Sequence, residues 1–221
     1  MKTEVIIVAG GLGKRLKARV FKAFVALKEQ ALFVHSLKVF NKHPAIDGII
    51  VVGVKEHLRL FARFAFPYKK VRAVVSGGKM RSDSVKCGLK ELSSDTDLVL
   101  VHDAARPFVD AGMIDRLINA LGKSKAAIVG VPVKSTIKKI NRKSLDIEET
   151  LPRDVLWEAQ TPQGFHKDVL VKAHARPIKQ EATDDAMLVE QSGLKVKMVM
   201  GDYRNIKITT PEDLKMAGQL I

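Results

Sequence analysis

Short apolar runs alternate along the chain with amphipathic segments of helical period. The runs are rich in β-branched residues, which is typical of buried strands in a parallel sheet. They occupy residues 5–9, 49–54, 71–76, 98–101, 126–133 and 196–200. The segments between them predict helices at residues 32–40, 56–66, 81–92, 113–121, 167–175 and 184–191. This alternation predicts βαβ units and an α/β fold with a doubly wound, mostly parallel, Rossmann-like sheet.

Residues 134–157 break this alternation, because they show no helical period. Two segments, 136–140 and 145–149, flank a turn-like Asn-Arg-Lys-Ser at 141–144, which predicts a β-hairpin. The first segment is basic and the second acidic, so antiparallel pairing would place opposite charges across the hairpin. A projecting hairpin is marginally stable alone. We therefore expect a single domain over 1–221 with a β-arm at about 134–157, whose simplest packing partner is a second copy of the chain.

The charge balance limits the classes of partner. Lys and Arg number 38 against 24 Asp and Glu, a net charge of +14, which indicates anionic partners. Against nucleic acid, the lysines are scattered between apolar segments and aromatic residues make up only 5% of the chain. Against a membrane, no apolar run approaches spanning length. Phosphorylated metabolites are therefore the favoured class.

The cysteine content and the N-terminal sequence predict the compartment. Cys87 is the only cysteine, which excludes an intrachain disulfide and a cysteine-based metal site and favours a reducing compartment. The apolar run before Gly10 is too short for a convincing signal sequence. We therefore expect a cytoplasmic protein.

A glycine-rich loop, Ala-Gly-Gly-Leu-Gly-Lys-Arg at residues 9–15, follows the first predicted strand. Glycines let backbone N–H groups approach phosphate oxygens, and Lys14 and Arg15 add positive charge. A P-loop is excluded because Arg15 lacks the hydroxyl that would bind Mg²⁺. A dinucleotide-binding fingerprint is excluded because Leu16 stands where a small residue is required and the acidic ribose partner is absent. A phosphate-binding loop and a purely structural turn both remain open.

Two further segments carry candidate binding groups. Lys22 is a lone cation among apolar neighbours, either a surface lysine or a ligand-binding one. Residues 76–84 form a second glycine turn that enters a helix. Its exposed amides could read the edge of a base with the help of Ser84 or Arg81, or the turn could be structural.

The fourth predicted strand ends in His102 and Asp103. A carboxylate in this position suits contact with a metal or with substrate hydroxyls, although Asp103 could instead cap a turn or pair with Arg106. We expect His102 to be a packing residue rather than a general base. Near the C-terminus, residues 205–214 predict a short strand that enters a helix, with Lys207 directed away from the core face.

Taken in order, these motifs resemble the 2-C-methyl-D-erythritol 4-phosphate cytidylyltransferases. The resemblance spans nearly the whole chain, and His-Asp-Ala-Ala-Arg-Pro (102–107) and Asn-Ile-Lys-Ile-Thr-Thr-Pro (205–211) are its most specific segments. It implies transfer of CMP from CTP to methylerythritol phosphate, release of pyrophosphate, and a place in non-mevalonate isoprenoid biosynthesis. It also implies a Mg²⁺ requirement and a homodimer whose β-arms complete each other's sites.

Site residues follow by position from this resemblance. Arg15 and Lys22 are expected to stabilise the transition state, and Arg153 and Lys207 to position the acceptor phosphate. Arg153 and Thr136 would reach the site of the partner subunit. Asp103 is the candidate metal ligand, and the alternative is a metal held by phosphate oxygens alone. The expected nucleotide-binding residues are Ala9, Gly10, Gly11, Gly13, Gly78 and Ser84, and the expected substrate-binding residues are Asp103, Ala104, Arg106, Thr136, Thr161 and Thr183.

Two alternatives stay open at this point. A sister enzyme acting on ribitol 5-phosphate or another polyol phosphate would keep nearly every residue named above. A basic nucleic-acid-binding module would explain the net charge but not the placement of motifs at strand ends. The chain also departs from the family, with Phe21-Lys22-Ala23 where Pro-Lys-Gln is usual and Ala9-Gly10-Gly11 where Ala-Ala-Gly is common.

Overall fold

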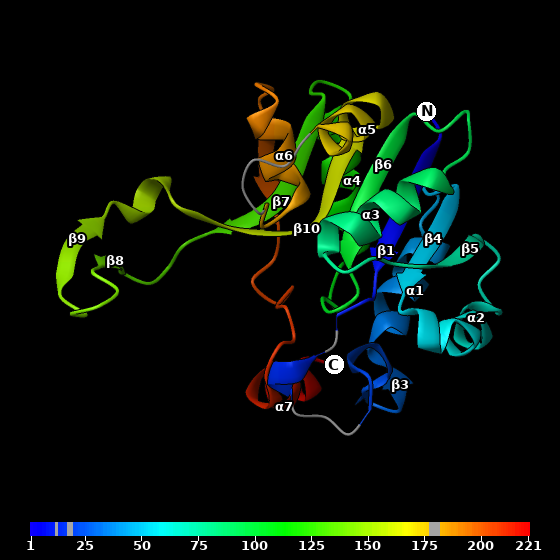
Figure 1. The fold of residues 1–221 in the computed structure, drawn as a ribbon, viewed down its shortest axis with the longest axis horizontal. Coiled ribbons are helices and arrows are strands. Elements are labelled where there is room, and N and C mark those ends of the chain that lie inside the picture. Colours follow the sequence, from blue (N-terminus) through cyan, green and yellow to red (C-terminus); the bar gives the residue numbers. More distant parts are fainter. Residues whose placement is uncertain (12, 17–19, 177–181) are drawn as a thin grey trace.

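The computed structural model describes residues 1–11, 13–16, 20–176 and 182–221. Within these ranges a seven-stranded sheet runs in the order β11-β7-β10-β6-β1-β4-β5 (Figure 1). All neighbouring strands are parallel except β10, which is antiparallel to both β6 and β7. The prediction of a doubly wound, mostly parallel sheet is thus confirmed. The strands are β1 (Thr3–Val8), β4 (Gly48–Gly53), β5 (Val71–Ser76), β6 (Leu98–Asp103), β7 (Ala126–Pro132), β10 (Trp157–His166) and β11 (Lys197–Met200).

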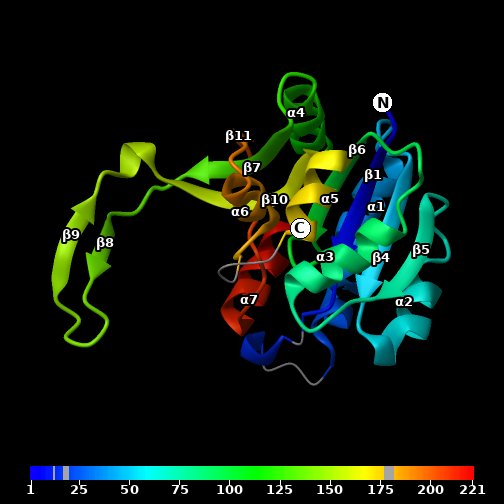
Figure 2. The same ribbon diagram turned by 45° about the horizontal axis from the view of Figure 1, so that its top comes forward.

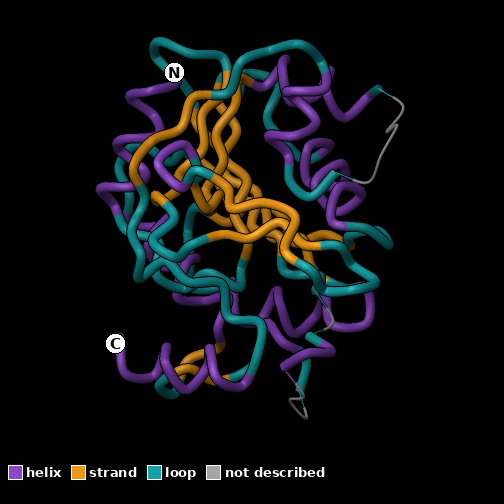
Figure 3. The backbone as a smooth tube through the Cα atoms, turned by 90° about the vertical axis from the view of Figure 1, so that its left-hand side faces the viewer, coloured by secondary structure: helices purple, strands orange, loops and turns teal. Residues whose placement is uncertain are grey.

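Helices cover both faces of the sheet, as Figure 3 shows. Successive residues of β1 explain why: Val5 and Ile7 belong to one hydrophobic cluster and Ile6 to another. Side chains alternate across a strand, so a strand buried on both faces is apolar throughout. One face is covered by α1 (Leu32–Lys42), α2 (Leu58–Ala65) and α4 (Ala111–Leu121), and the other by α3 (Arg81–Lys90), α5 (Lys167–Ala175) and α6 (Asp185–Gln191).

A third, smaller cluster lies beyond the carboxyl ends of β1 and β6. It contains Leu16, Leu27 and Ile208 and packs against α7 (Pro211–Leu220), which lies below the sheet in Figure 1. Thr210 caps α7, its hydroxyl accepting a hydrogen bond from the Asp213 N–H at 3.2 Å. Around this cluster lie two short 3₁₀ helices, η1 (Lys14–Leu16) and η2 (Lys22–Phe24), and the hairpin of β2 (Ala26–Leu27) and β3 (Gln30–Ala31).

The hairpin of β8 (Ile137–Ile140) and β9 (Ile147–Leu151) extends away from the sheet (Figures 1 and 2). Opposite charges do face each other on it: Lys139 Nζ lies 3.5 Å from Glu148 Oε2, an exposed pair that contributes little to stability. Several apolar side chains of this region are exposed instead of packed. Leu145, Ile147 and Val155 have exposures of 69%, 62% and 69%. Self-association through the arm stays a prediction.

Two segments differ from the sequence-based expectations. The strand β10 was not predicted, because its buried side chains Gln160, Thr161 and Gln163 are polar and break the apolar pattern. They are buried with hydrogen-bond partners, for example Gln160 Nε2 donating to the Asp202 carbonyl at 2.9 Å. The strand expected at residues 205–208 was wrong. Ile208 is buried in the third cluster, and its N–H donates to the Ala105 carbonyl at 2.9 Å, but no sheet ladder forms there.

Candidate active site

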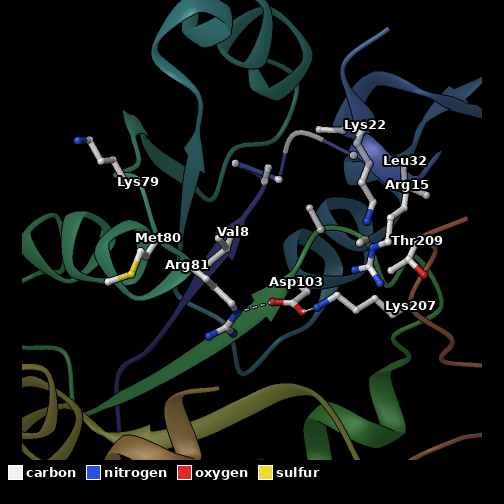
Figure 4. Close-up of a pocket in the computed structure, with 17 residues that line it drawn as sticks. Val8, Arg15, Lys22, Leu32, Lys79, Met80, Arg81, Asp103, Lys207 and Thr209 are labelled. Atoms are coloured by element: carbon white, nitrogen blue, oxygen red, sulfur yellow. Dashed lines mark hydrogen bonds and ion pairs between the residues drawn. The ribbon is translucent and has the colours of Figure 1, made fainter. Parts of the chain in front are cut away.

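Two cavities meet at the carboxyl end of β6. The larger, about 450 Å³, lies beyond the ends of β1 and β6 (Figure 4), and the smaller, about 190 Å³, shares Arg81, Asp103 and Lys207 with it. Ligands of open α/β sheets bind at this edge. The larger is lined by Val8, Ala9, Gly10, Gly11, Gly13, Arg15, Lys22, Ala23, Leu32, Lys79, Met80, Arg81, Asp103, Ala104, Ala105, Lys207 and Thr209. The smaller is lined by Arg81, Asp103, Arg106, Ala159, Gln160, Thr161, Gln163, Thr183, Asp184 and Lys207.

Gly13 allows Lys22 to reach the larger cavity. Its φ of +63° lies in the left-handed region that favours glycine. A Cβ at this position would lie 2.7 Å from Lys22 Cβ, which is closer than side chains tolerate. The glycine loop therefore has a packing requirement at Gly13 in addition to any contact with a ligand.

Aromatic rings hold η2 in place. Phe21 and Phe24 flank Lys22 in the sequence, and both pack on Phe61 of α2, with ring centroids 6.3 and 4.6 Å from it. Phe24 also meets Phe33 of α1 edge to face at 5.9 Å. These contacts fix the residues on both sides of Lys22 against α1 and α2.

The Lys22 ammonium faces Arg15 and Lys207 across the larger cavity (Figure 4). Burial lowers the pKa of Lys22 to about 8, and the positive charges of Lys207 and Arg15 act in the same direction. Asp103 and Asp213 oppose the shift. Three cations, two from the segment after β1 and one from the segment before α7, thus converge on one cavity, a site suited to a strongly anionic ligand.

Asp103 lies between two cations. Its Oδ1 is 3.0 Å from Arg81 Nε and its Oδ2 is 2.6 Å from Lys207 Nζ (Figure 4). Burial alone would raise the pKa of Asp103, but Arg81 and Lys207 outweigh it and hold this pKa well below its usual range. The alternative of an ion pair with Arg106 is wrong, because the Arg106 guanidinium instead donates to the carbonyls of Asn205 and Ala159, at 2.7 and 3.1 Å.

His102 is buried beside this site and fully hydrogen-bonded. Its Nε2 donates to the Arg106 carbonyl at 3.0 Å, which leaves Nδ1 to accept from the Thr161 hydroxyl at 3.1 Å. The same hydroxyl accepts from the Asp103 N–H at 3.1 Å. Burial lowers the pKa of His102 to about 4, so the ring is neutral at physiological pH. His102 thus orients the strand end, as expected of a packing residue.

Most of the predicted site residues come together. Nine line the larger cavity, namely Ala9, Gly10, Gly11, Gly13, Arg15, Lys22, Asp103, Ala104 and Lys207. Arg106, Thr161 and Thr183 line the smaller one. Gly78 and Ser84 lie on the described lining of neither cavity; Ser84 is buried, and its hydroxyl donates to the Met80 carbonyl at 3.2 Å. Their part in nucleotide binding stays a prediction.

Two predicted residues lie away from the cavities of their own chain. Thr136 and Arg153 are exposed on the arm, and Arg153 Nη1 donates to the Lys134 carbonyl at 3.0 Å. Neither belongs to the described lining of the two cavities. Their expected contribution to the site of a second copy stays a prediction.

The sequence reasoning missed several lining residues, above all Arg81, which it considered only as an aid to base reading. Arg81 Nη1 also lies 2.7 Å from Asp185 Oδ2, so this guanidinium joins two carboxylates. The glycine turn before α3, at the carboxyl end of β5, was the available signal. Lys79, Thr209, Gln163 and Asp184 were missed as well.

The carboxylates limit what metal the site could hold. Among the described residues, no three His, Cys, Asp or Glu side chains are grouped so that they could hold a metal ion. Asp103 is the one carboxylate on the described lining of the larger cavity. This donor set fits Mg²⁺, which commonly takes one or two protein carboxylates and otherwise substrate phosphates and water.

In the part of the chain that the structure describes, no helix is long and apolar enough to cross a bilayer.

Comparison with known proteins agrees with the fold. A family model described as 2-C-methyl-D-erythritol 4-phosphate cytidylyltransferase matches residues 3–221. The chain is 44% identical over 218 residues to the protein of that name from Alkaliphilus metalliredigens, covering 96% of this chain and 90% of that one. It is 42% identical over 223 residues to the protein of the same name from Clostridioides difficile, covering 99% and 93%.

Solved structures give the same result. The crystal structure of a 4-diphosphocytidyl-2C-methyl-D-erythritol synthase from Anaerococcus prevotii is similar with a TM-score of 0.88 and 32% identity, covering 99% of this chain and 97% of that one. The resemblance noted in the motifs is confirmed by matches that extend over the whole fold. The chain belongs to the 2-C-methyl-D-erythritol 4-phosphate cytidylyltransferase family.

Proposed function

We propose that the protein transfers the CMP group of CTP to 2-C-methyl-D-erythritol 4-phosphate, a step of isoprenoid precursor biosynthesis. An oxygen of the acceptor phosphate attacks the α-phosphorus of CTP, the new P–O bond forms, and the bond to the β-phosphate oxygen breaks to release pyrophosphate. The observation that carries this proposal is the convergence of Arg15, Lys22 and Lys207 on one cavity beside a glycine loop.

The chemistry needs positioning and charge neutralisation rather than a base. The attacking oxygen is already anionic, and two polyanions must approach each other, so fixed cations supply most of the catalysis. We assign Arg15 and Lys22 to the triphosphate and the developing charge on the α-phosphate. Lys207 lines both cavities, so we assign it to the acceptor phosphate at their junction. His102, neutral and engaged at both nitrogens, has no proton-transfer step to perform.

Mg²⁺ is proposed as the cofactor, with Asp103 and the triphosphate oxygens as its ligands. When bound, the ion would neutralise phosphate charge and polarise the α-phosphate. Asp103 is suited to this because its low pKa keeps the carboxylate ionised throughout the physiological range. Arg81 and Lys207 already hold the carboxylate in one orientation.

We also propose a homodimer joined through the β-arm. The exposed apolar side chains Ile140, Leu145 and Ile147 support it, because apolar surface gathered on a projecting hairpin is typical of an interaction site. Arg153 and Thr136 would then lie at the acceptor cavity of the partner subunit.

The acceptor is tested by pyrophosphate release from CTP and Mg²⁺ with methylerythritol phosphate or ribitol 5-phosphate. We expect kcat/KM for methylerythritol phosphate to be at least about 100-fold higher, because a site shaped for its branched four-carbon chain holds the longer chain of ribitol 5-phosphate with the phosphate misplaced. Comparable values would mean that the protein is a general polyol-phosphate cytidylyltransferase. No release with either acceptor would overturn the proposed function.

The nucleotide base provides a second test. Cytosine and uracil differ in the donors and acceptors of the pyrimidine edge, so a site built for one leaves polar groups unpaired with the other. With UTP as the donor, we expect kcat/KM to be at least about 100-fold lower than with CTP. Initial rates at fixed acceptor concentration measure this ratio, and values within a few fold of each other would exclude base reading at residues 9–10 and 77–84.

The pH dependence should report Lys22. Its pKa of about 8 in the free protein means that the ammonium loses its proton as the pH rises through that value. We therefore expect kcat/KM for CTP to fall above about pH 8, while kcat at saturating CTP falls only at higher pH because the bound triphosphate raises the pKa. Lys22→Arg should remove the alkaline fall, since arginine stays protonated. An unchanged fall in that variant would assign the titration to another group.

A further inference from the structure

The ion pairs at Asp103 belong to a longer series of paired side chains, which extends from the cavities into the body of the fold. His174 on α5 directs Nε2 to Asp185 Oδ1 at 2.9 Å, and the other oxygen of Asp185 lies 2.7 Å from Arg81 Nη1. Arg81 then contacts Asp103, and Asp103 contacts Lys207. Five side chains from α5, α6, α3, β6 and the segment before α7 thus form one continuous series of ion pairs and hydrogen bonds.

The inner end of this series is almost completely buried. The side chains of His174 and Asp185 are 3% and 1% exposed. Burial alone would raise the pKa of Asp185, but Arg81 and His174 outweigh it and hold the pKa below its ordinary value. Gln163 of β10 fixes the backbone at the same point, because its Oε1 accepts from the N–H groups of Asp185 and Ala186, both at 3.2 Å.

A histidine at position 174 lowers the stability of the fold through one buried polar atom. Its Nδ1 is buried, and no hydrogen-bond partner for it is found in the described part of the chain. Buried polar atoms without partners reduce stability, and an apolar side chain of similar size would avoid that cost. Within the described ranges, the His174 side chain makes one polar contact, with Asp185. The hydrogen bond to Asp185 is therefore the role of this histidine.

We propose that His174 and Asp185 are positioning residues for Lys207 and act through Arg81 and Asp103. The inference rests on the proposed function. Asp185 shares the Arg81 guanidinium with Asp103, and this leaves one Asp103 oxygen for Lys207. Without the charge of Asp185, Arg81 is drawn to Asp103 alone, where an arginine pairs best with both oxygens. Lys207 then loses its partner and its fixed place between the two cavities.

The kinetic test is a double-mutant cycle between Asp185→Asn and Lys207→Ala. In the wild-type background, Asp185→Asn is expected to lower kcat/KM for the acceptor about 10- to 100-fold, as a small misplacement of a reacting group does. In the Lys207→Ala background the same change is expected to lower it less than about threefold, because the group being positioned is gone. Equal losses in both backgrounds would overturn the proposal.

Two replacements of His174 separate positioning from packing. Gln places an amide N–H near the position of Nε2 and can still donate to Asp185, whereas Leu cannot. His174→Gln is expected to retain kcat/KM for the acceptor within about threefold and His174→Leu to lose about tenfold or more. His166→Gln is the matched control, because His166 directly precedes α5 and its side chain bonds only the Leu121 carbonyl among the described contacts. Equal losses for Gln and Leu, or losses that follow the thermal stability of the variants, would contradict positioning.

A readout without turnover keeps this proposal distinct from the proposed function. Lys207 paired with Asp103 at 2.6 Å should be protected from amine acylation, with exposed Lys38 as the internal reference. Asp185→Asn is expected to increase the labelling rate of Lys207 relative to Lys38 about tenfold, because the Lys207 ammonium then lacks the ion pair that protects it, as measured by mass spectrometry. An unchanged ratio would overturn the positioning proposal even in an active enzyme. A raised ratio in Asp185→Asn, together with no transferase activity in the wild-type protein, would support the positioning proposal while the proposed function fails.

Discussion

Replacing Lys22 by alanine is expected to lower kcat about 10²–10³-fold while the Kd of CTP changes far less. The reason is that the positive charge of Lys22 is needed mainly in the transition state. The pentavalent α-phosphate of the transition state concentrates negative charge beside the Lys22 ammonium, whereas CTP in the ground state can still be held by the glycine loop and Arg15. Initial rates at saturating substrates and the CTP affinity of the same variant, measured by calorimetry, separate the two quantities.

The matched control for this prediction is Lys38→Ala. Lys38 is exposed on α1, so its removal takes away the same charge without touching the cavity, and kcat should stay within about twofold. Lys22→Arg should recover part of the lost kcat, because the charge returns with a different geometry. If Lys22→Ala weakened CTP binding by the same factor as it lowered kcat, Lys22 would be a ground-state binding residue and the assignment would be wrong.

The parts of this fold that are apolar were predictable from the sequence. Strands such as β4 are buried on both faces, so they appear as unbroken runs of Ile and Val. The edge of the sheet that carries the site followed from the same reasoning, because the carboxyl ends of parallel strands lie together. Arg15 and Lys22 follow β1 and Asp103 ends β6, so they were expected at one edge of the sheet, and the structure brings them to one cavity.

The parts that depend on buried polar groups were not predictable in this way. In a linear sequence, Gln163 or Asp185 has the pattern of a surface residue, and only the packed structure shows that each is buried with its partners. The central place of Arg81 depends on Asp103 and Asp185, which lie 22 and 104 positions further along the chain. Hydrophobic periodicity carries no information about such pairs, since it records burial and not hydrogen-bond partners.

The arm raises the question of where the acceptor cavity is completed. Lys207 stands at the junction of the cavities and Arg106 lines the smaller one, but Arg153, which the family resemblance assigns to the acceptor phosphate, projects with η4 (Arg153–Val155) on the arm. A cation remote from its own cavity can contribute to catalysis only in another copy. If the dimer forms as proposed, each site contains Lys22 of one subunit and Arg153 of the other.

Arg153→Ala is therefore expected to lower kcat/KM for the acceptor at least about 100-fold on its own, the cost of removing a charged contact to a phosphate. Mixing it with the inactive Lys22→Ala chain, after dissociation and reassembly, should restore activity. Each heterodimer holds one site with both substitutions and one site with none, so an equal mixture should recover roughly a quarter of the wild-type rate. The control is a mixture of the Lys22→Ala chain with a chain that carries both substitutions. No intact site can form in that mixture. If the mixture of the two single variants were as inactive as this control while mass spectrometry showed heterodimers, Arg153 would not act across the subunits.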